Sequence, residues 1–499
     1  MIYRSTRSQG QEVTAVQAIV QGLSPDGGLF VPKEFPAPFS AAALKEIFAL
    51  PYQDMAKKIL ALFLTDYSAE QLAEIVKGAY GQQWDDDRIA PLTDKKAGNY
   101  YLELFHGPTL AFKDVALQCL PRLMKTALEN SDDHRGIVIL TATSGDTGTA
   151  AMRGFQSLAK TRVIVFYPYQ GVAPIQLKQM LSENSDNTVA VAVEGNFDQA
   201  QTRVKQIFND PDMNSLLADH DLTFSSANSM NVGRLLPQVI YYFAAYKQLL
   251  DQEAIAFGDP VNFSVPTGNF GDILAGYYAQ KLGLPVGRLI CASNKNNVLT
   301  DFFKTGKYDK KRDFYVTNSP SMDILVSSNL ERLLFDLCQD PATVKSLMEQ
   351  LNTKGEYQLP EDMQKKLSSF WADYATPEEI EGEIKRVYEE SGYVIDPHTA
   401  VAWKIAQEQA SPEVPMVVLS TASPFKFCRD VFNALYGPLK LKSTTPEAAA
   451  FEYMDALADS TGVEPPQCLS ALRTQSVRFN AVYDVDQAPE RVLAAAAKL

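Results

Sequence analysis

The sequence predicts an α/β protein built on open parallel sheets flanked by helices, preceded by a mainly helical N-terminal domain. Beyond about residue 95, short apolar runs without polar alternation are separated by helical patterns, which is typical of parallel strands buried on both faces. Before residue 95, turn signals alternate with amphipathic helical patterns. The chain of 499 residues, 46% of them hydrophobic, is long enough for a substantial core and several domains.

Composition and charge exclude several classes of protein. The chain has 46 lysines and arginines against 60 aspartates and glutamates, and its net charge of -14 argues against a nucleic-acid-binding surface. No run reaches the roughly 18 to 20 apolar residues of a membrane span. The start lacks the apolar stretch of a secretory signal, and the five cysteines form no Cys-x-x-Cys pair. We therefore expect a cytoplasmic protein with free thiols and no nucleic-acid or membrane partner.

Helical and turn patterns predict how the chain is divided. Residues 41–50 and 69–80 have the spacing of amphipathic helices, and the charged, turn-rich stretch 84–99 predicts a boundary. The end of the chain is rich in alanine and glutamate, which favours helix. We predict a mainly helical N-terminal domain (1–95), an α/β catalytic core of two lobes (96–440) and a helical tail packed on that core (441–499).

Six apolar runs in the core predict the strands of the sheets. Helical segments separate them, and a Glu-rich stretch at 377–390 predicts a solvated helix within an insertion. In open α/β sheets, ligands bind where the carboxyl ends of strands lead into helices, so these junctions are the candidate sites. The predicted strands are 137–143, 163–167, 189–193, 261–265, 289–292 and 416–420.

One junction, 266–272, is rich in glycine. Gly268 and Gly271 allow a tight turn, and its amides would meet the positive end of the following helix dipole. The pattern predicts a cradle for one phosphate, although a plain turn capped by Asp272 would have the same sequence. The junction has neither the Lys-Ser/Thr of a Walker loop nor a complete Gly-x-Gly-x-x-Gly, which argues against nucleoside triphosphates and dinucleotides.

A second junction, 140–149, places hydroxyl groups beside the amides of a helix start. Ser144 and Thr147 supply hydroxyls that suit an anion the size of a carboxylate. A simple helix cap at Ser144 or Asp146 is the alternative interpretation of this loop.

A third junction brings Lys113 next to Ala111 and Phe112. Apolar neighbours would lower the proton affinity of the lysine and make it a nucleophilic amine. A solvated surface lysine at a helix start is the alternative interpretation.

Together the three junctions predict pyridoxal phosphate (PLP) acting on an amino acid. A phosphate cradle, a carboxylate-binding loop and a nucleophilic lysine are the parts that such chemistry requires. The four histidines form no His-Glu-x-x-His motif or Cys/His cluster, so no metal site is expected. A Gly-x-Ser-x-Gly nucleophile elbow is also absent.

Seven motifs distributed along the chain carry a family resemblance. They are Asp26-Gly-Gly-Leu-Phe-Val-Pro32, Gly107-Pro-Thr-Leu-Ala-Phe-Lys-Asp114, Thr143-Ser-Gly-Asp-Thr-Gly148, Asn228-Ser-Met-Asn-Val-Gly-Arg234, Gly268-Asn-Phe-Gly-Asp272, Asp396-Pro-His-Thr-Ala-Val401 and Ser420-Thr-Ala-Ser-Pro-Phe-Lys-Phe427. These motifs resemble the threonine synthases, in the tryptophan-synthase-β-like group of PLP enzymes. The resemblance implies PLP fold type II, with two parallel or mixed open sheets flanked by helices.

The resemblance also implies how the cofactor is held. Lys113 would bind PLP covalently, the glycine-rich loop would hold its phosphate, and the neutral hydroxyl of Thr421 would face its pyridine nitrogen and temper the electron sink. Either Asp146 or Asn228 would meet the 3′ oxygen, and Asp146 stands where related PLP enzymes have an asparagine. The implied cofactor-binding residues are Lys113, Asn228, Gly268, Asn269, Phe270, Gly271, Asp272 and Thr421.

The implied reaction converts O-phospho-L-homoserine and water to L-threonine and phosphate, a lyase reaction of amino-acid biosynthesis with Lys113 as the catalytic base. An acidic protein needs a local cationic pocket for a dianionic substrate, and Arg234 can clamp a phosphate with two hydrogen bonds. Arg4 and Arg7 are further candidate cations. The implied substrate-binding residues are Ser144, Gly145, Asp146, Thr147, Ser229, Asn231, Arg234 and Lys426.

Two other functions stay open. A PLP-dependent serine or threonine dehydratase needs Lys113 and both loops but no second anion pocket, so Arg234 and Lys426 distinguish it from a synthase. A catalytically silent homologue that binds PLP or a phosphorylated metabolite would not need all these residues together. A monomer and a homodimer are both compatible with the resemblance.

Overall fold

The structure is a computed structural model that describes residues 1–10, 12–94, 96, 98–130, 135–195, 197–409, 411 and 413–496. Lys95 and Ala97 of the predicted boundary stretch, and the last three residues of the predicted tail, lie outside this description. All five cysteines are unpaired thiols. None of the described helices has both the length and the apolar character needed to cross a membrane.

The N-terminal region combines helices with a small antiparallel sheet of order β2-β1-β3. The predicted helices at 41–50 and 69–80 are α2 and α4, and the side chains of Ser40 and Ser68 cap them. The sheet is not predicted by the sequence patterns because its strands have only three or four residues. The elements are β1 (Ile2–Ser5), β2 (Glu12–Thr14), α1 (Ala15–Gln21), β3 (Phe30–Pro32), α2 (Ala41–Phe48), α3 (Tyr52–Phe63) and α4 (Ala69–Ala79).

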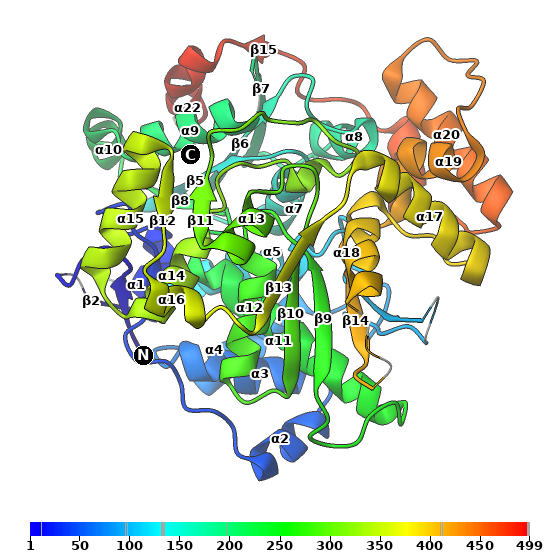
Figure 1. The fold of residues 1–499 in the computed structure, drawn as a ribbon. Helices are drawn as coiled ribbons and strands as arrows, with labels where there is room; N and C mark the ends of the chain where they lie inside the picture. Colours follow the sequence, from blue (N-terminus) through cyan, green and yellow to red (C-terminus); the bar gives the residue numbers. More distant parts are fainter. Residues whose placement is uncertain are drawn as a thin grey trace.

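A five-stranded sheet of order β13-β10-β9-β14-β4 forms one half of the core (Figure 1). All of its strand pairs are parallel. The predicted strands at 261–265, 289–292 and 416–420 are its three central strands, whereas the edge strands β4 and β13 are not predicted. Edge strands are partly exposed and therefore lack a continuous apolar run. The strands are β4 (Tyr100–Glu103), β9 (Val261–Pro266), β10 (Val286–Ser293), β13 (Phe370–Tyr374) and β14 (Met416–Ser420).

A second five-stranded sheet, of order β15-β7-β6-β5-β8, forms the other half and is also parallel throughout. The predicted strands at 137–143, 163–167 and 189–193 are β5, β6 and β7. The edge strand β15 belongs to the predicted helical tail, so the tail extends this sheet as well as packing on the core. The strands are β5 (Gly136–Ala142), β6 (Thr161–Pro168), β7 (Thr188–Val193), β8 (Leu222–Ser226) and β15 (Val482–Tyr483).

Helices flank both sheets, so the predicted α/β fold is confirmed. The predicted solvated helix at 377–390 is α17, which exposes its charged residues and buries Ile380, Ile384 and Val387. A short two-stranded sheet of β11 (Lys307–Asp309) and β12 (Glu356–Gln358) lies within the predicted insertion. The remaining helices along the core are α5 (Lys113–Leu117), α6 (Leu120–Glu129), α7 (Asp146–Gly154), α8 (Pro174–Leu181), α9 (Phe197–Phe208), α10 (Pro211–Ala218), α11 (Val232–Asp251), α12 (Gly271–Lys281), α13 (Val298–Thr305), η1 (Pro320–Met322), α14 (Leu330–Cys338), α15 (Pro341–Lys354), α16 (Glu361–Lys365), α17 (Pro377–Ser391), α18 (Pro397–Glu408), η2 (Pro424–Phe427), α19 (Cys428–Tyr436), α20 (Pro446–Thr461), α21 (Gln467–Ser470), η3 (Ala471–Thr474), η4 (Val485–Gln487) and α22 (Ala488–Ala496).

The longest helix, α11, lies at the centre of the molecule and packs against α3, α5 and α12. Its sequence is apolar around most of its circumference, which is typical of a helix buried on all sides. The side chain of Asn231 caps its first turn by accepting a hydrogen bond from the N–H of Gly233. Arg234 follows in that turn, and its position is fixed by the surrounding core.

Candidate active site

A cavity opens where the carboxyl ends of strands from both sheets face each other. Its lining encloses about 910 Å³, the mouth included. Strands β5, β9 and β14 each end at this cavity, and the segments that follow them supply much of its wall. The predicted site residues among its lining are Lys113, Ser144, Asp146, Thr147, Asn228, Ser229, Arg234, Gly268, Asn269, Phe270, Gly271, Asp272 and Thr421.

Lys113 is buried, which excludes the alternative of a solvated surface lysine. It is 8% exposed, at the first residue of α5, and its Nζ lies 4.8 Å from the ring centre of Phe112. Burial lowers the pKa of Lys113, the cations of Arg234 and Lys426 lower it further, and Asp146 opposes them. A lysine in this environment yields its proton more readily and becomes a nucleophile or a base.

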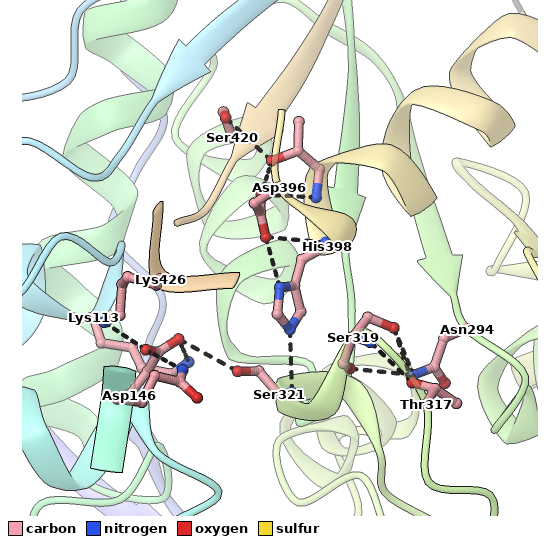
Figure 2. Close-up of polar contacts among 12 residues, drawn as sticks. Lys113, Asp146, Asn294, Thr317, Ser319, Ser321, Asp396, His398, Ser420 and Lys426 are labelled. Carbon is pink, nitrogen blue, oxygen red and sulfur yellow. Dashed lines mark hydrogen bonds and ion pairs between the residues drawn. The ribbon is translucent and has the colours of Figure 1, made fainter. Parts of the chain in front are cut away.

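Asp146 is the centre of a buried polar network (Figure 2). Its Oδ1 lies 2.6 Å from Nζ of Lys426 and accepts a 2.6 Å hydrogen bond from Nε2 of Gln176. Its Oδ2 lies 3.4 Å from Nζ of Lys113 and accepts a 3.3 Å hydrogen bond from the hydroxyl of Ser321. Burial alone would raise the pKa of Asp146, but the ammonium groups of Lys426 and Lys113 outweigh it and hold that pKa well below its usual range.

Lys426 does not line the cavity, contrary to its predicted role beside the substrate phosphate. Its side chain has no exposed surface, and its Nζ donates to the carbonyl of Thr109 at 2.7 Å in addition to its contact with Asp146. The ammonium group is therefore held between Asp146 and Thr109. Lys426 fixes the charge of Asp146 rather than contributing a cation to the pocket.

The loop before α7 is built by Thr143 and Gly145. The hydroxyl of Thr143 accepts hydrogen bonds of 2.9 Å from the N–H groups of Gly145 and Gly148. Gly145 is the N-cap residue at φ +136°, and a Cβ there would lie 2.6 Å from Oε1 of Gln176, so glycine is required. The N-cap residue Gly145 has no side chain, and the first-turn N–H of Gly148 is bonded to Thr143, which argues against the cap interpretation of Ser144 and Asp146.

The glycine-rich loop before α12 also lacks a side-chain cap, so the interpretation of Asp272 as a cap is wrong. Phe270 is the N-cap residue, in the left-handed region at φ +65°. Oδ1 of Asp272 instead accepts hydrogen bonds from the hydroxyls of Tyr241 and Tyr242 at 2.5 and 2.9 Å. Burial raises the pKa of Asp272 to about 6, although both hydroxyls oppose this effect. Asp272 therefore joins α12 to α11 beneath the loop.

Arg234 brings a positive charge to the cavity wall. It is 4% exposed, donating to the carbonyl of Ala227 at 2.9 Å and to the hydroxyl of Thr147 at 3.4 Å. No carboxylate within the described part of the chain forms an ion pair with it. Burial lowers the pKa of Arg234 to about 10, which leaves the guanidinium charged at neutral pH. A buried, unpaired cation in a cavity is suited to an anionic ligand.

The neighbouring asparagines have different surroundings. Asn228 lines the cavity, where its Oδ1 accepts a 2.6 Å hydrogen bond from the hydroxyl of Thr141. Asn231, a predicted substrate-binding residue, does not line the cavity. Its Nδ2 donates to the carbonyls of Ile19 and Ser226 at 2.9 and 3.0 Å, which fixes α1 against the start of α11 outside the cavity.

Three further predicted residues, Thr421, Arg7 and Arg4, have other contacts in the structure. The carbonyl of Thr421 accepts a 2.8 Å hydrogen bond from the N–H of Phe112, so the start of α5 is tied to the end of β14. Arg7 forms a 2.7 Å ion pair with Glu331 and does not line the cavity. Arg4 donates to the side chain of Gln339 at 3.2 Å and is likewise outside it.

His398 and Ser321 line the cavity but are not predicted as site residues. Nδ1 of His398 lies 2.6 Å from Oδ2 of Asp396, and its Nε2 accepts a 3.1 Å hydrogen bond from the N–H of Ser321 (Figure 2). His398 therefore holds the segment that places the Ser321 hydroxyl on Asp146. In the sequence, the Asp-Pro-His motif indicates only the start of a helix. The hydrogen bond between His398 and Ser321 joins residues that are 77 positions apart, so no local sequence pattern indicates it.

Comparison with protein families finds matches along the whole chain. The family described as "Pyridoxal-phosphate dependent enzyme" matches residues 90–422. Residues 2–80 match "Threonine synthase N terminus", and residues 399–492 match "Threonine synthase, C-terminal".

Individual relatives agree with these matches. "Threonine synthase-like 1" of Macaca fascicularis is 40% identical over 96% of this chain, which spans 64% of that protein's length. "Threonine synthase" of Pseudomonas aeruginosa is 39% identical, covering 88% of this chain and 91% of its own. The crystal structure of PLP-bound threonine synthase from Brucella melitensis, 37% identical, covers 99% of both chains with a TM-score of 0.85. Because sequence and fold agree over this length, the chain belongs to the threonine synthase family of pyridoxal-phosphate-dependent enzymes.

Proposed function

We propose that this chain is a threonine synthase that converts O-phospho-L-homoserine and water to L-threonine and phosphate. The observation that carries the proposal is the unpaired guanidinium of Arg234, buried in the same cavity as Lys113. A dehydratase acting on an unphosphorylated amino acid has no use for this second cation. An acidic chain of net charge -14 needs such a local charge to bind a phosphorylated substrate.

The cavity residues fit PLP, the cofactor of the family. A buried lysine of lowered proton affinity is suited to hold an aldehyde. At Gly268, a Cβ would lie 3.2 Å from the carbonyl oxygen of Ser321 and from Cα of Met322, so the backbone passes through a space that only glycine fills easily. Lys113 would hold the cofactor, Gly268–Asp272 its phosphate and Thr421 its ring nitrogen. Of the two candidates for the 3′ oxygen, we favour Asn228, because it is neutral.

When bound, PLP supplies an electron sink for negative charge developing on the substrate. Lys113 removes the proton at Cα and moves protons between neighbouring carbons, because one flexible amine can reach adjacent atoms in succession. Arg234 and Ser229 bind the substrate phosphate, which leaves from Cγ. The hydroxyls of Ser144 and Thr147 and the N–H groups of Ser144, Asp146 and Thr147 bind the substrate carboxylate, whereas the N–H of Gly145 is bonded to Thr143. Loss of a proton from Cβ accompanies departure of the phosphate. Cγ is then protonated, water adds its hydroxyl at Cβ, and Cα regains a proton.

The product stoichiometry tests this proposal. Purified protein loaded with PLP should release phosphate and threonine in equal amounts from O-phospho-L-homoserine. Lys113→Ala should abolish both products together with the visible absorbance of the bound cofactor. Formation of 2-oxobutyrate in place of threonine would establish a lyase of the dehydratase type, and absence of turnover in fully loaded protein would establish a silent homologue.

A further inference from the structure

A second segment, Ser327–Asn329, binds the glycine-rich loop from behind. The hydroxyl of Ser327 donates to the carbonyl of Gly268 at 2.8 Å. The backbone N–H and the Nδ2 of Asn329 both donate to the carbonyl of Asn269, at 3.0 and 3.1 Å. Asn329 has no exposed surface and Ser327 is 7% exposed, so water does not compete for these bonds.

These bonds determine where the amides of the loop point. In a trans peptide group the carbonyl and the following N–H point in opposite directions. Holding the carbonyls of Gly268 and Asn269 on Ser327–Asn329 therefore directs the N–H groups of Asn269 and Phe270 away from that segment. Both residues line the cavity, and neither N–H donates a hydrogen bond within the part of the chain that the structure describes.

Arg332, in the first turn of α14, holds the segment Ser327–Asn329 through hydrogen bonds of its guanidinium. Its guanidinium donates to Oδ1 of Asn329, to the carbonyl of Phe30 at 3.0 Å and to the carbonyl of Met230 at 2.6 Å. It is 1% exposed and forms no ion pair with a carboxylate among the described residues. Burial lowers the pKa of Arg332 to about 10, which leaves a cation behind the loop at neutral pH. This charge favours an anion on the other side.

We propose that Ser327, Asn329 and Arg332 are positioning residues for the cofactor phosphate. They hold two carbonyls outward, so that the amides of Asn269 and Phe270 are oriented toward the phosphate before it binds. The inference rests on the proposed placement of that phosphate at Gly268–Asp272. None of the three side chains lines the cavity, so their effect acts through the loop.

The test compares PLP with pyridoxal, the same aldehyde without the phosphate group, by absorbance titration of the apoprotein. Wild type should bind PLP far more tightly than pyridoxal. Asn329→Ala and Ser327→Ala should each weaken PLP binding by about 10-fold and change pyridoxal binding less than about 2-fold. Asn262→Ala is the matched control, because this buried amide binds the N–H of Arg288 at the opposite end of β9. The control should keep the wild-type ratio of the two affinities.

The outcomes separate this inference from the proposal on which it rests. If wild type prefers PLP but both variants keep the wild-type ratio, or lose both ligands equally while circular dichroism shows them folded, the positioning role is wrong. If wild type binds PLP and pyridoxal equally, the phosphate does not bind at Gly268–Asp272, and the placement itself is wrong.

Discussion

Asp146 and Arg234 are oppositely charged residues of the cavity wall, and their surroundings differ. Asp146 forms ion pairs with two lysines, whereas the guanidinium of Arg234 donates, within the described part of the chain, to a carbonyl and a hydroxyl. The first arrangement keeps a carboxylate ionised next to the amine of Lys113. The second leaves a cation whose burial is compensated only when an anion binds. At the scale of single residues, the site is therefore asymmetric and is suited to a substrate with a terminal phosphate.

Removing the guanidinium should affect the substrate and not the cofactor. We expect Arg234→Ala to lower kcat/KM for O-phospho-L-homoserine by about 100-fold or more, since truncating one partner of a buried charge pair costs about 2–5 kcal/mol. The cofactor absorbance should be unchanged. Arg153→Ala, an exposed arginine in α7, should keep wild-type kinetics. Wild-type kinetics in Arg234→Ala would remove this residue from the substrate site.

Single residues could be predicted where chemistry depends on near neighbours. Lys113 is recognisable from its apolar neighbours, and Gly268 from the turn before a helix. Lys426 and Asn231 do not line the cavity, and the sequence does not show this because their partners, Asp146 and Ile19, are separated from them by more than two hundred residues. No local sequence pattern shows that a lysine forms an ion pair elsewhere in the fold, or that a side-chain amide donates its hydrogen bonds to a distant carbonyl.

At the scale of elements, the start of α7 depends on a single glycine conformation. Gly145→Ala places a side chain at φ +136° and against Gln176, and should lower the free energy of unfolding by about 2 kcal/mol. Gly382→Ala is the control, because this glycine lies in α17 with open space around it, and the change should be neutral or stabilise by up to about 1 kcal/mol. Urea unfolding measures both. Equal effects of the two substitutions would contradict the strained turn.

Asp272, which joins α12 to α11, predicts that the difference in stability between wild type and a non-titrating variant depends on pH. Burial raises the pKa of Asp272 from its ordinary value of 3.8 to about 6, so the folded protein holds this proton to higher pH than the unfolded chain does. The resulting stabilisation is complete below about pH 3.8 and is lost as the pH rises through about 6. Asp272→Asn does not titrate, and its free energy of unfolding should rise relative to wild type by up to about 3 kcal/mol between pH 4 and 7. A difference that is constant over this range in urea unfolding would contradict a raised pKa.

Some strands could be predicted from their sequences and others could not. The central strands β5 and β6 contain long apolar runs because they are buried on both faces, and β10 has a shorter run in its second half. The edge strand β15 has two residues and pairs with β7, which is far away in the sequence, so β15 has no strand signal of its own.

At the scale of the whole molecule, two parallel sheets bring their carboxyl ends to one cavity. Chain segments near residues 113, 146, 234, 270 and 421 meet there although they are far apart in the sequence. The rule that ligands bind at the carboxyl ends of parallel strands predicts that these junctions matter. It does not predict how the two sheets face each other, and that arrangement decides which side chains share the cavity.

The most direct test of the central claim is the fate of oxygen from isotopically labelled water during turnover of O-phospho-L-homoserine. Loss of phosphate from Cγ by C–O cleavage, followed by addition of water at Cβ, predicts one ¹⁸O atom in the hydroxyl of threonine and none in the released phosphate. Mass spectrometry of both products measures this. Label in the phosphate together with homoserine as the other product would show P–O hydrolysis and would contradict a threonine synthase reaction at this site.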